Sequence, residues 1–283
     1  MENHYRLQYP AIPGLRMRYY CAKDPQPVEA RIFPPHVHDD LEIYVLLEGK
    51  ASFMVENRLY DLQAGDVIVS KPNELHNCVL PEPTVHKHLC FWFDVSSEGL
   101  FEEFLAHGMG KGNLISPSAP EKERLEELYE ELCGEDAPGA EHRRFYRTLE
   151  LLDILRRNTP NEHRERDLPP LLREILDDIN EHFAGIRDLQ YFTDTYYLSQ
   201  STLNRLFRKY LQTTPKLYLE GKRLAHARRL LREGKSVLSA GMEAGFSDDS
   251  NFIRLFKKRF YMTPNEYKNG REIKDNDAVN LCD

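Results

Sequence analysis

Long hydrophobic runs are absent from this chain of 283 residues. No apolar segment approaches the roughly 20 residues that a membrane-spanning helix requires, so we expect no membrane partner. Residues 1–6 also lack a basic segment followed by an apolar stretch, which disfavours a secretory signal peptide. The composition, with 41% hydrophobic and 30% charged residues, is instead ordinary for a globular protein with a packed core.

Cysteine is scarce and irregularly placed. The chain has five cysteines, an odd number, and none of them forms a Cys-x-x-Cys pair. This usage disfavours a zinc ribbon and favours a reduced protein in the cytoplasm.

The chain also lacks an overall excess of positive charge, because 46 acidic residues and 38 basic residues give a net charge of −8. This average argues against a nucleic-acid partner, but the charge is unevenly distributed. Residues 1–170 carry −11, residues 171–271 carry +6 and residues 272–283 carry −3. An acidic region followed by a basic segment indicates a separate anion-binding module.

Hydrophobic patterning predicts a multidomain α+β protein. From about Arg16 to Val95, short β-rich runs alternate with turn residues, as in a β-sandwich or small barrel. Two amphipathic helices joined at Pro138-Gly139 follow, and after a polar, proline-bearing stretch the pattern is helical throughout. We predict a β-barrel domain at residues 1–100, a helical hairpin segment at 101–158, a linker at 159–170 and an all-α domain at 171–271.

The basic segment contains an internal repeat. Each copy consists of a short amphipathic helix, at residues 189–196 or 237–244, a three-residue turn, and a second helix capped by Ser199 or Ser247. A Thr-Pro pair ends each copy and starts a new helix near the proline. Eight residues of the first copy, Ser201, Arg205, Leu206, Phe207, Lys209, Thr214, Pro215 and Tyr218, recur as Ser250, Arg254, Leu255, Phe256, Lys258, Thr263, Pro264 and Tyr267.

Helical spacing also separates core residues from surface residues within the repeat. Leu203, Leu206, Phe207 and Tyr210 share one face and are expected to form a core stripe. Leu255 and Phe256 are expected in the core of the second copy. Two helix-turn-helix units in register, in the only basic part of an acidic chain, indicate DNA binding.

Residues 171–270 resemble the C-terminal DNA-binding domain of the AraC/XylS family of bacterial transcription regulators. The resemblance is clearest at residues 245–258 and 263–267, and it continues at residues 198–207 and 223–231. It implies two recognition helices, joined by a long helix over residues 216–233, which enter adjacent major grooves about 34 Å apart.

The chain departs from the family pattern at several positions. Ala240-Gly241 stands where the family usually has Ile-Ala, and Thr193 replaces a small alanine. Gln212 and Tyr261 stand where a glycine often precedes the Thr-Pro pair. Because a glycine inside a helix costs up to about 1 kcal/mol, we expect the second unit to be less rigid than the first.

The predicted DNA contacts fall into two classes. Arginine can bind guanine, and asparagine or glutamine can bind adenine, whereas basic residues further along the helices contact phosphates. The predicted base or groove contacts are Gln200, Ser201, Thr202, Asn204, Arg205, Asp249, Ser250, Asn251 and Arg254. The predicted phosphate contacts are Arg208, Lys209, Lys257 and Lys258, for which a solvated helix face is the alternative. Asp248 and Asp249 are also placed to complement a helix N-terminus.

The pattern His36-x-His38-x-x-x-Glu42, followed by His76, has metal-ligand spacing. On a strand, His36, His38 and Glu42 would share one side, and His76 would come from a neighbouring strand. The run resembles the first motif of the cupin barrel, whose metal-dependent members use these four side chains as ligands. In AraC-type regulators with a cupin-like sensor, histidines near these positions line an effector pocket.

We therefore assign His36, His38, Glu42, His76 and Tyr44 to effector binding, with no required cofactor. A divalent metal at the three histidines and Glu42, and a purely structural role for the histidines, are the alternatives. His86 and His88 are expected to be structural or rim residues. For Tyr44, Phe53, Phe91 and Trp92, core packing is the default and ligand stacking the alternative.

The chain is thus identified as a member of the AraC/XylS family: a cytoplasmic, ligand-responsive regulator of carbohydrate or small-molecule metabolism genes, not an enzyme. The expected partners are double-stranded DNA, a small-molecule effector, RNA polymerase and a second copy of the chain. A homodimer could form through the apolar stripe of the hairpin, or this stripe could pack on its own barrel. The stripe comprises Leu125, Leu128, Leu132, Leu149 and Leu152. The alternative function is a metal-dependent cupin enzyme, a dioxygenase or isomerase, which would leave the basic repeat without a use.

Overall fold

The structure is a computed structural model in which the chain divides into two units. The first comprises residues 1–31, 39–74 and 78–166, and the second comprises residues 32–38, 75–77 and 167–283. The structure describes residues 2–8, 16–22 and 27–28 as strands, and residues 35–80, 82–95, 99–133, 140–161 and 164–270 with their side chains. A β-rich first part and a helical second part confirm the predicted fold class, whereas the predicted domain boundaries stay predictions.

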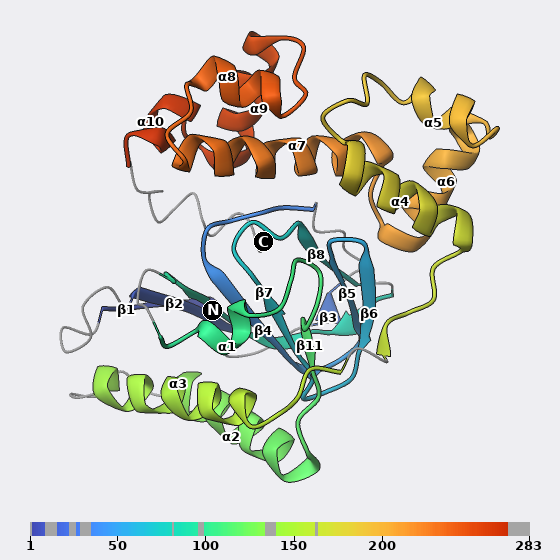
Figure 1. The fold of residues 1–283 in the computed structure, drawn as a ribbon. Helices are drawn as coiled ribbons and strands as arrows, with labels where there is room; N and C mark the ends of the chain where they lie inside the picture. Colours follow the sequence, from blue (N-terminus) through green and yellow to red (C-terminus); the bar gives the residue numbers. More distant parts are fainter. Residues whose placement is uncertain are drawn as a thin grey trace. The chain divides into compact units, whose positions relative to one another are not determined.

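The β-rich part contains a six-stranded, a three-stranded and a two-stranded sheet among the described residues. The six-stranded sheet has the order β1 (Glu2–Gln8), β2 (Arg16–Ala22), β10 (Lys87–Phe93), β4 (Leu41–Glu48), β7 (Val67–Ser70) and β11 (Leu114–Ile115). The three-stranded sheet has the order β6 (Arg58–Leu62), β5 (Ala51–Val55) and β8 (His76–Val79). In the two-stranded sheet, β3 (Pro27–Val28) pairs with β9 (Thr84–Val85). Figure 1 shows β4 and β7 facing β5 and β6 across the domain.

The central strands β4 and β10 are antiparallel, and alternate residues point to opposite faces. On one face, Ile43 and Val45 join Phe91 in a single hydrophobic core. On the other face, Glu42 lies opposite Trp92 and Tyr44 opposite Cys90 in the strand register. The period of two therefore separates an apolar face from a face that carries polar and ionisable side chains.

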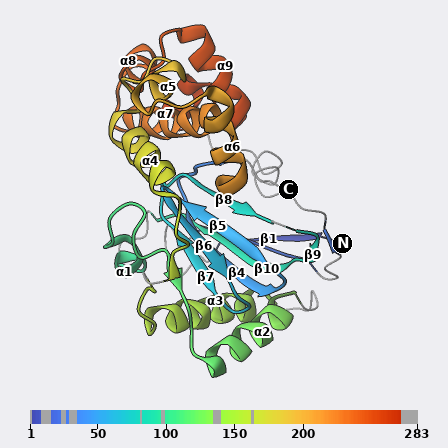
Figure 2. The ribbon, with the colours of Figure 1, turned by 90° about the vertical axis from the view of Figure 1, so that its right-hand side faces the viewer.

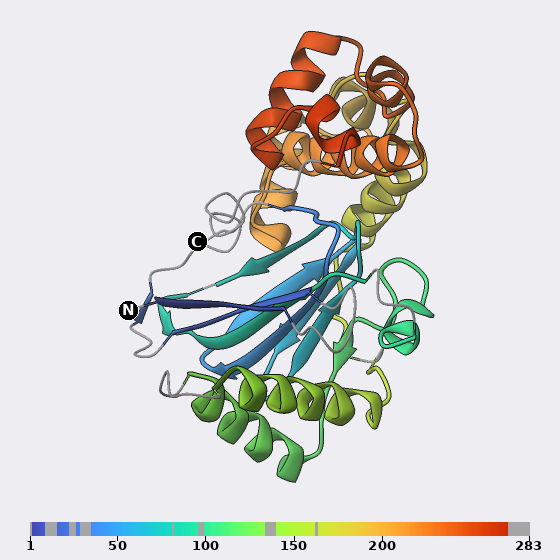
Figure 3. The same ribbon diagram turned by 90° about the vertical axis from the view of Figure 1, so that its left-hand side faces the viewer.

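A helical hairpin covers the apolar face. It consists of α2 (Ala119–Cys133) and α3 (Ala140–Arg156), which run side by side beneath the sheet (Figure 3). The short helix α1 (Glu102–Leu105) precedes the hairpin and contributes Phe104 to the same core. Four leucines of the predicted dimerisation stripe lie in the core and the fifth packs against it: Leu125, Leu128, Leu132 and Leu152, with Leu149 half-buried.

The stripe therefore packs on its own barrel, while the dimerisation role of residues 101–158 stays a prediction. Its leucines are buried against the sheet of their own chain, which is the alternative that the sequence left open. Each fully buried leucine side chain stabilises the fold by about 1.5–3 kcal/mol, so a partner chain could reach the stripe only by removing it from this core. The expectation that the cysteines are reduced also changes. Cys133 in α2 is disulfide-bonded, whereas Cys78 and Cys90 are free thiols.

Part of the segment predicted as a linker is bound to the strands. The Arg164 guanidinium forms an ion pair with the fully buried Asp66 at 2.9 Å, and Lys122 pairs with the same carboxylate at 3.1 Å. The Arg166 amide donates to the Leu59 carbonyl at 2.7 Å. These contacts leave residues 167–169 between the last strand contact and the next helix.

From residue 170 to residue 270, every regular element is a helix. The elements are α4 (Pro170–His182), α5 (Gln190–Thr195), α6 (Gln200–Leu211), α7 (Pro215–Arg232), α8 (Val237–Glu243), α9 (Asp249–Phe260) and α10 (Pro264–Lys268). The pairs α5–α6 and α8–α9 are the two predicted helix-turn-helix units, and α7 connects them (Figures 1 and 2). Thr214 and Thr263 cap α7 and α10, each followed by a proline at the first helical position, as the Thr-Pro pairs predict.

The core of each unit differs in detail from the prediction. Phe207 and Phe256 are fully buried, as expected, but Leu206 and Leu255 are only half-buried. The buried positions recur every four residues along each helix, which leaves Leu206 and Leu255 at the edge of the buried stripe. These positions are Leu203, Phe207 and Leu211 in α6, and Phe252, Phe256 and Phe260 in α9.

The unusual residues of the second unit have physical reasons. A Cβ atom at Gly241 would lie 2.8 Å from Cδ1 of Phe252, so the glycine allows α8 to approach the buried ring on α9. The lower rigidity expected for the second unit stays a prediction. Gln212 and Tyr261 end α6 and α9 in the left-handed conformation, with φ of 51° and 55°, where glycine would fit without strain.

Candidate functional site

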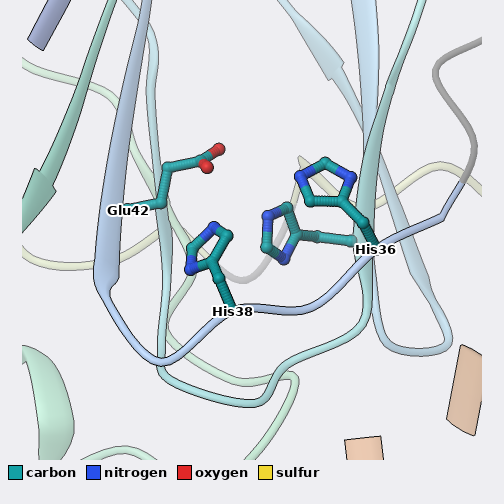
Figure 4. Close-up of side chains that lie close together, drawn as sticks. His36, His38 and Glu42 are labelled. Atoms are coloured by element: carbon teal, nitrogen blue, oxygen red, sulfur yellow. The ribbon is translucent and has the colours of Figure 1, made fainter. Parts of the chain in front are cut away.

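Four predicted ligand residues of the β-rich part lie together. The ligand atoms of His36, His38, Glu42 and His76 are all within 4.8 Å of one another, and all four residues are buried. Figure 4 shows the side chains of His36, His38 and Glu42 directed toward one another. The histidine ring centroids are 4.4 Å apart for His36 and His76, and 4.8 Å apart for His38 and His76.

The backbone that positions them is local and differs from the prediction. His36 and His76 form an isolated antiparallel bridge, in which each amide donates to the other's carbonyl at 2.9 and 3.0 Å. Residues 37–40 are not a strand, and β4 begins at Leu41. His38 and Glu42 therefore converge because the chain turns between them, while strand parity explains only the side of β4 on which Glu42 lies.

Trp92 fixes the carboxylate of Glu42. The two residues are cross-strand partners in β10 and β4, and the indole Nε1 donates to Glu42 Oε2 at 2.7 Å. The sequence placed Trp92 among the packing or stacking residues and missed this polar role. The strand register would have shown it, but register cannot be read from a single sequence.

A second polar group lies two residues along β4. The Tyr44 hydroxyl contacts Nε2 of His86, and the Tyr44 ring stacks on the His88 ring with centroids 5.2 Å apart. The His86 and His88 rings stack on each other at 4.3 Å, and Phe53 packs against Tyr44 at 5.0 Å. The structure thus joins His86 and His88 to Tyr44, whereas Phe91 lies in the core on the opposite face.

Desolvation sets the charge of this second group. Burial lowers the pKa of His86 to about 3, with a further lowering from the neighbouring His88, and burial lowers the pKa of His88 to about 4. Burial also raises the pKa of the Tyr44 hydroxyl well above its usual value. All three side chains are neutral near pH 7, so the group offers uncharged donors and acceptors.

In the helical part, α6 presents the first set of predicted DNA contacts. Ser199 caps the helix, and its Oγ accepts from the Thr202 amide at 3.1 Å. The Ser201 and Thr202 hydroxyls also lie within 2.9 Å of this Oγ, so both are engaged in the cap. Gln200 and Arg205 are exposed, and Arg205 forms no ion pair with any residue that the structure describes.

The cap of α9 differs from the prediction. Asp248, not Ser247, is the N-cap, and its Oδ1 accepts from the Ser250 and Asn251 amides at 2.7 and 3.1 Å. The Arg254 Nη2 donates to Asn251 Oδ1 at 2.7 Å, which holds the guanidinium over the first turns of the helix. A carboxylate at the cap also complements the partial positive charge of the helix N-terminus.

The remaining predicted DNA contacts are placed on the surface. Asn204 is half-buried and donates through Nδ2 to the Gln200 carbonyl at 2.8 Å, so its amide group is partly engaged within α6. The others are exposed: Arg208, Lys209, Asp249, Ser250, Lys257 and Lys258.

Tyr197 is a surface residue that the sequence reading did not single out. It lies in the turn between α5 and α6 with φ of 51°, and its side chain is 95% exposed. The matching turn of the second unit has Gly245, also with positive φ. Glycine adopts positive φ at such a turn position without strain. The presence of an aromatic residue there was the sequence signal that could have identified Tyr197.

Comparisons with known proteins bear on both parts of the chain. A family model for a helix-turn-helix domain matches residues 193–270, and a model for an AraC-like ligand-binding domain matches residues 26–91. The first match spans α6 and α9, and the second spans His36, His38, Glu42 and His76. The chain belongs to the AraC family.

Relatives of this AraC-family chain include proteins described as HTH-type transcriptional activator RhaS. The Salmonella arizonae protein is 27% identical over 263 residues, which cover 88% of this chain and 94% of the relative. The Escherichia fergusonii protein is 25% identical over 252 residues, covering 85% and 89%. These names describe activators of transcription, and the comparisons give no support to the alternative of a metal-dependent enzyme.

Similar solved structures include apo ToxT from Vibrio cholerae, with 13% identity and a TM-score of 0.37 over 92% of this chain and 98% of that one. A protein from Listeria innocua is 26% identical, with a TM-score of 0.35 over 37% of this chain and 100% of that one. The two family models and the relatives identify this AraC-family chain as a ligand-responsive, DNA-binding transcriptional regulator. No helix in the part of the chain that the structure describes has the length and hydropathy to cross a bilayer.

Proposed function

We propose that the chain activates transcription by placing α6 and α9 in adjacent major grooves of its operator. The single observation that carries this proposal is the duplicated, capped helix with an exposed arginine at the same position, Arg205 in α6 and Arg254 in α9. The activator role is supported by the description of the RhaS relatives. The proposed target genes serve carbohydrate or small-molecule metabolism.

The residues on the two helices have distinct proposed roles. Arg205 and Arg254 read bases, because a guanidinium can bind guanine bidentately in the major groove. Gln200, Asn204 and Asn251 contribute further groove contacts, and the hydroxyls of Ser201, Thr202 and Ser250 act near the helix N-termini. Asp249 lies in the first turn of α9 and limits which bases approach it. The exposed cations Arg208, Lys209, Lys257 and Lys258 bind phosphates and set the register on the duplex.

The proposed effector is a small polar molecule that binds on the polar face of β4. Tyr44, with its neutral partners His86 and His88, offers uncharged hydrogen-bonding groups. His36, His38, Glu42 and His76 form the other polar group on this side. Such a set suits a molecule that carries several hydroxyl groups, because each hydroxyl both donates and accepts.

Effector binding would act by population shift. An effector changes the equilibrium between two conformations only by the difference in its affinity for them. A shift from a ratio of 1:99 to 99:1 needs a preference of about 10⁴-fold for the active state. We further propose RNA polymerase and a second copy of the chain as partners, a cytoplasmic location next to the chromosome, and no catalytic residue.

Selection of bound DNA from a random pool tests this function. The chain should enrich a bipartite site whose halves are about one helical turn, 10–10.5 base pairs, apart. Repeating the selection with candidate polyols should change the yield of the same motif. Enrichment of no motif under any condition would contradict the proposal.

A further inference from the structure

We propose that Arg223 is a positioning residue that fixes the spacing at which α6 and α9 meet DNA. It lies in α7, the helix that connects the two helix-turn-helix units, and its side chain is buried. The guanidinium contacts both the segment that leads into the first unit and the turn of the second. The inference rests on the proposed function for its consequence at DNA, whereas the contacts belong to the protein alone.

The first contact is with the segment that follows α4 and leads to α5. Arg223 Nε donates to the Phe183 carbonyl at 3.0 Å, and Nη2 donates to the Ile186 carbonyl. The planar fork of a guanidinium can serve two such carbonyls at once, which the point charge of a lysine ammonium does not reproduce. The helix α5 is also tied to α4, because the Tyr196 hydroxyl donates to the Asp178 carboxylate at 3.2 Å. Arg223 therefore holds the entry to the first helix-turn-helix unit.

The second contact is with the turn of the second helix-turn-helix unit. The Arg223 guanidinium lies 6.0 Å from the centre of the Phe246 ring, within the range of a cation–π interaction. Phe246 is buried and packs on Phe252 of α9 with ring centroids 5.0 Å apart. A Cβ atom at Gly245 would lie 2.5 Å from the Ala184 carbonyl oxygen, so this turn also touches the segment after α4 directly. We call the contacts of Arg223 with the two units the Arg223 bridge.

A second buried arginine of α7 holds the other end of α9. The Arg228 guanidinium lies 4.7 Å from the centre of the Phe260 ring, at the last residue of α9, and 5.3 Å from that of Tyr267. The helix α9 is therefore attached to α7 near both of its ends, through Phe246 and through Phe260. Arg223 adds the contacts with the segment that leads into the first unit, so we assign the spacing to it.

The burial of this charge is consistent with a role in geometry. Burial lowers the pKa of the Arg223 guanidinium, with a smaller opposite effect from Glu220. A buried charge costs free energy, and an apolar residue of similar size could fill the same space without that cost. An apolar residue would not fix two carbonyls and an aromatic ring in one arrangement, which is what the guanidinium supplies.

Spacing matters because DNA is helical. One base pair changes the separation of two half-sites by about 3.4 Å and their angle around the axis by about 34°. Two helices held in one arrangement therefore fit one spacing best. A looser pair would accept several spacings, each with lower affinity, because it loses more freedom on binding.

Duplexes of varied spacing test the role. The selected bipartite site is made with one or two base pairs added or removed between its halves. The half whose sequence preference Arg205→Ala relaxes, which is the half read by α6, is also made alone. The full-length wild type should lose at least about tenfold in affinity for a change of one base pair, comparable to one mismatched base pair.

Arg223→Lys keeps the charge and removes the planar fork. It should lower affinity at the preferred spacing by about tenfold and leave less than about threefold between neighbouring spacings, with unchanged affinity for the α6 half alone. Arg229→Lys, at an exposed arginine of α7 that pairs with Glu233, is the matched control and should bind like the wild type. An equal loss on every duplex, or a wild-type spacing preference in Arg223→Lys, would overturn the role.

Two further readouts apply even where Arg223→Lys does not fold. Phe246→Leu removes the ring and keeps both hydrogen bonds of Arg223, and it should weaken the spacing preference while keeping the affinity for the α6 half. A wild-type preference in Phe246→Leu would contradict the bridge. A wild-type chain that loses less than about twofold for a change of one base pair has no fixed spacing, which would overturn the proposal by itself.

Hydrogen exchange of the full-length protein tests the bridge without DNA. The Ile186 and Phe246 amides are each hydrogen-bonded to a backbone carbonyl, so each of the two joined segments has a reporter. In Arg223→Lys, both amides should exchange at least about tenfold faster, because local opening becomes easier. The Thr202 amide in the cap of α6 should not change. Faster exchange at one reporter alone, or at neither, would overturn the bridge.

The two experiments separate this inference from the proposed function. A chain that enriches no motif but shows faster exchange at both reporters would reject DNA reading and retain the bridge. A chain that enriches a bipartite motif, with the same spacing preference in the wild type and Arg223→Lys, would reject the bridge and retain the regulator.

Discussion

The two helix-turn-helix units repeat one pattern but differ in the turn between their two helices. In the first unit, the turn between α5 and α6 carries Tyr197, whose side chain is almost completely exposed. In the second, the matching position is Gly245, where a Cβ atom would lie 2.5 Å from the Ala184 carbonyl oxygen. The turn of the first unit is therefore open to solvent. The turn of the second unit is packed against the backbone that follows α4.

The two helices that we propose to contact DNA, α6 and α9, differ in the same direction. Both arginines are exposed, but Arg254 donates to Asn251 Oδ1. The cap of α9 is the Asp248 carboxylate, whereas that of α6 is the Ser199 hydroxyl. Preorganised side chains lose less entropy on binding. We therefore expect the second unit to favour one arrangement of bases and the first to adapt to several.

The largest expected effect is on the packed turn. Gly245→Ala should lower the free energy of unfolding by about 2–5 kcal/mol, because it combines positive-φ strain with a backbone clash. Tyr197→Ala, at the matching open position, should change it by less than about 0.5 kcal/mol. Urea unfolding curves of the two variants measure the difference, and equal effects would remove the distinction between the turns.

The next effect is on DNA affinity. Arg205→Ala and Arg254→Ala should each cost about 1–3 kcal/mol on the selected site and relax sequence preference at one position. Lys258→Ala should instead weaken binding to all sequences and reduce the salt dependence by about one counterion. Titrations of selected and random duplexes at several salt concentrations separate these roles. A variant of either arginine that binds both duplexes like the wild type would show that this arginine reads no base.

Helix capping gives a smaller effect. Asp248→Ala should destabilise the protein by about 1–2 kcal/mol, and Ser199→Ala by about 0.5–1 kcal/mol, because the Asp248 carboxylate accepts from two amides and the Ser199 hydroxyl from one. Ser247→Ala is the matched control, and it should have little effect because Ser247 lies outside the cap. Thermal unfolding compares the three, and a larger loss in Ser247→Ala than in Asp248→Ala would restore the cap that the sequence predicted.

The smallest effect concerns the helix ends. Gln212→Gly and Tyr261→Gly should each stabilise the fold by about 0.5–1 kcal/mol, because glycine adopts positive φ without strain. The gain should be similar in the two units, since this feature is shared by the open and the packed copy. A loss of stability in denaturant unfolding would show that these side chains make contacts that outweigh the strain.

Much of the helical part could be predicted from sequence because its signals are local. Ser199 and the pairs Thr214-Pro215 and Thr263-Pro264 mark helix starts that the structure confirms. The cap at Asp248 was misassigned to Ser247, because two adjacent residues can both cap and only backbone geometry decides between them.

The site in the β-rich part was only partly predictable. Its ligand spacing was visible in the sequence, and the structure brings His36, His38, Glu42 and His76 together. The link from Trp92 to Glu42 and that from His86 to Tyr44 depend on strand pairing over a long sequence separation, which one sequence does not contain. The hairpin stripe was ambiguous for a similar reason, because an apolar helix face does not indicate which surface covers it.

We propose that α6 and α9 read one DNA site together. The most direct measurement is the affinity of the wild-type chain for the selected bipartite site, before and after insertion of five base pairs between its halves. The insertion should lower the affinity to that of a single half-site, because α7 connects the two units within one helical domain. An unchanged affinity would contradict joint reading by α6 and α9, since it would mean that one helix alone provides recognition.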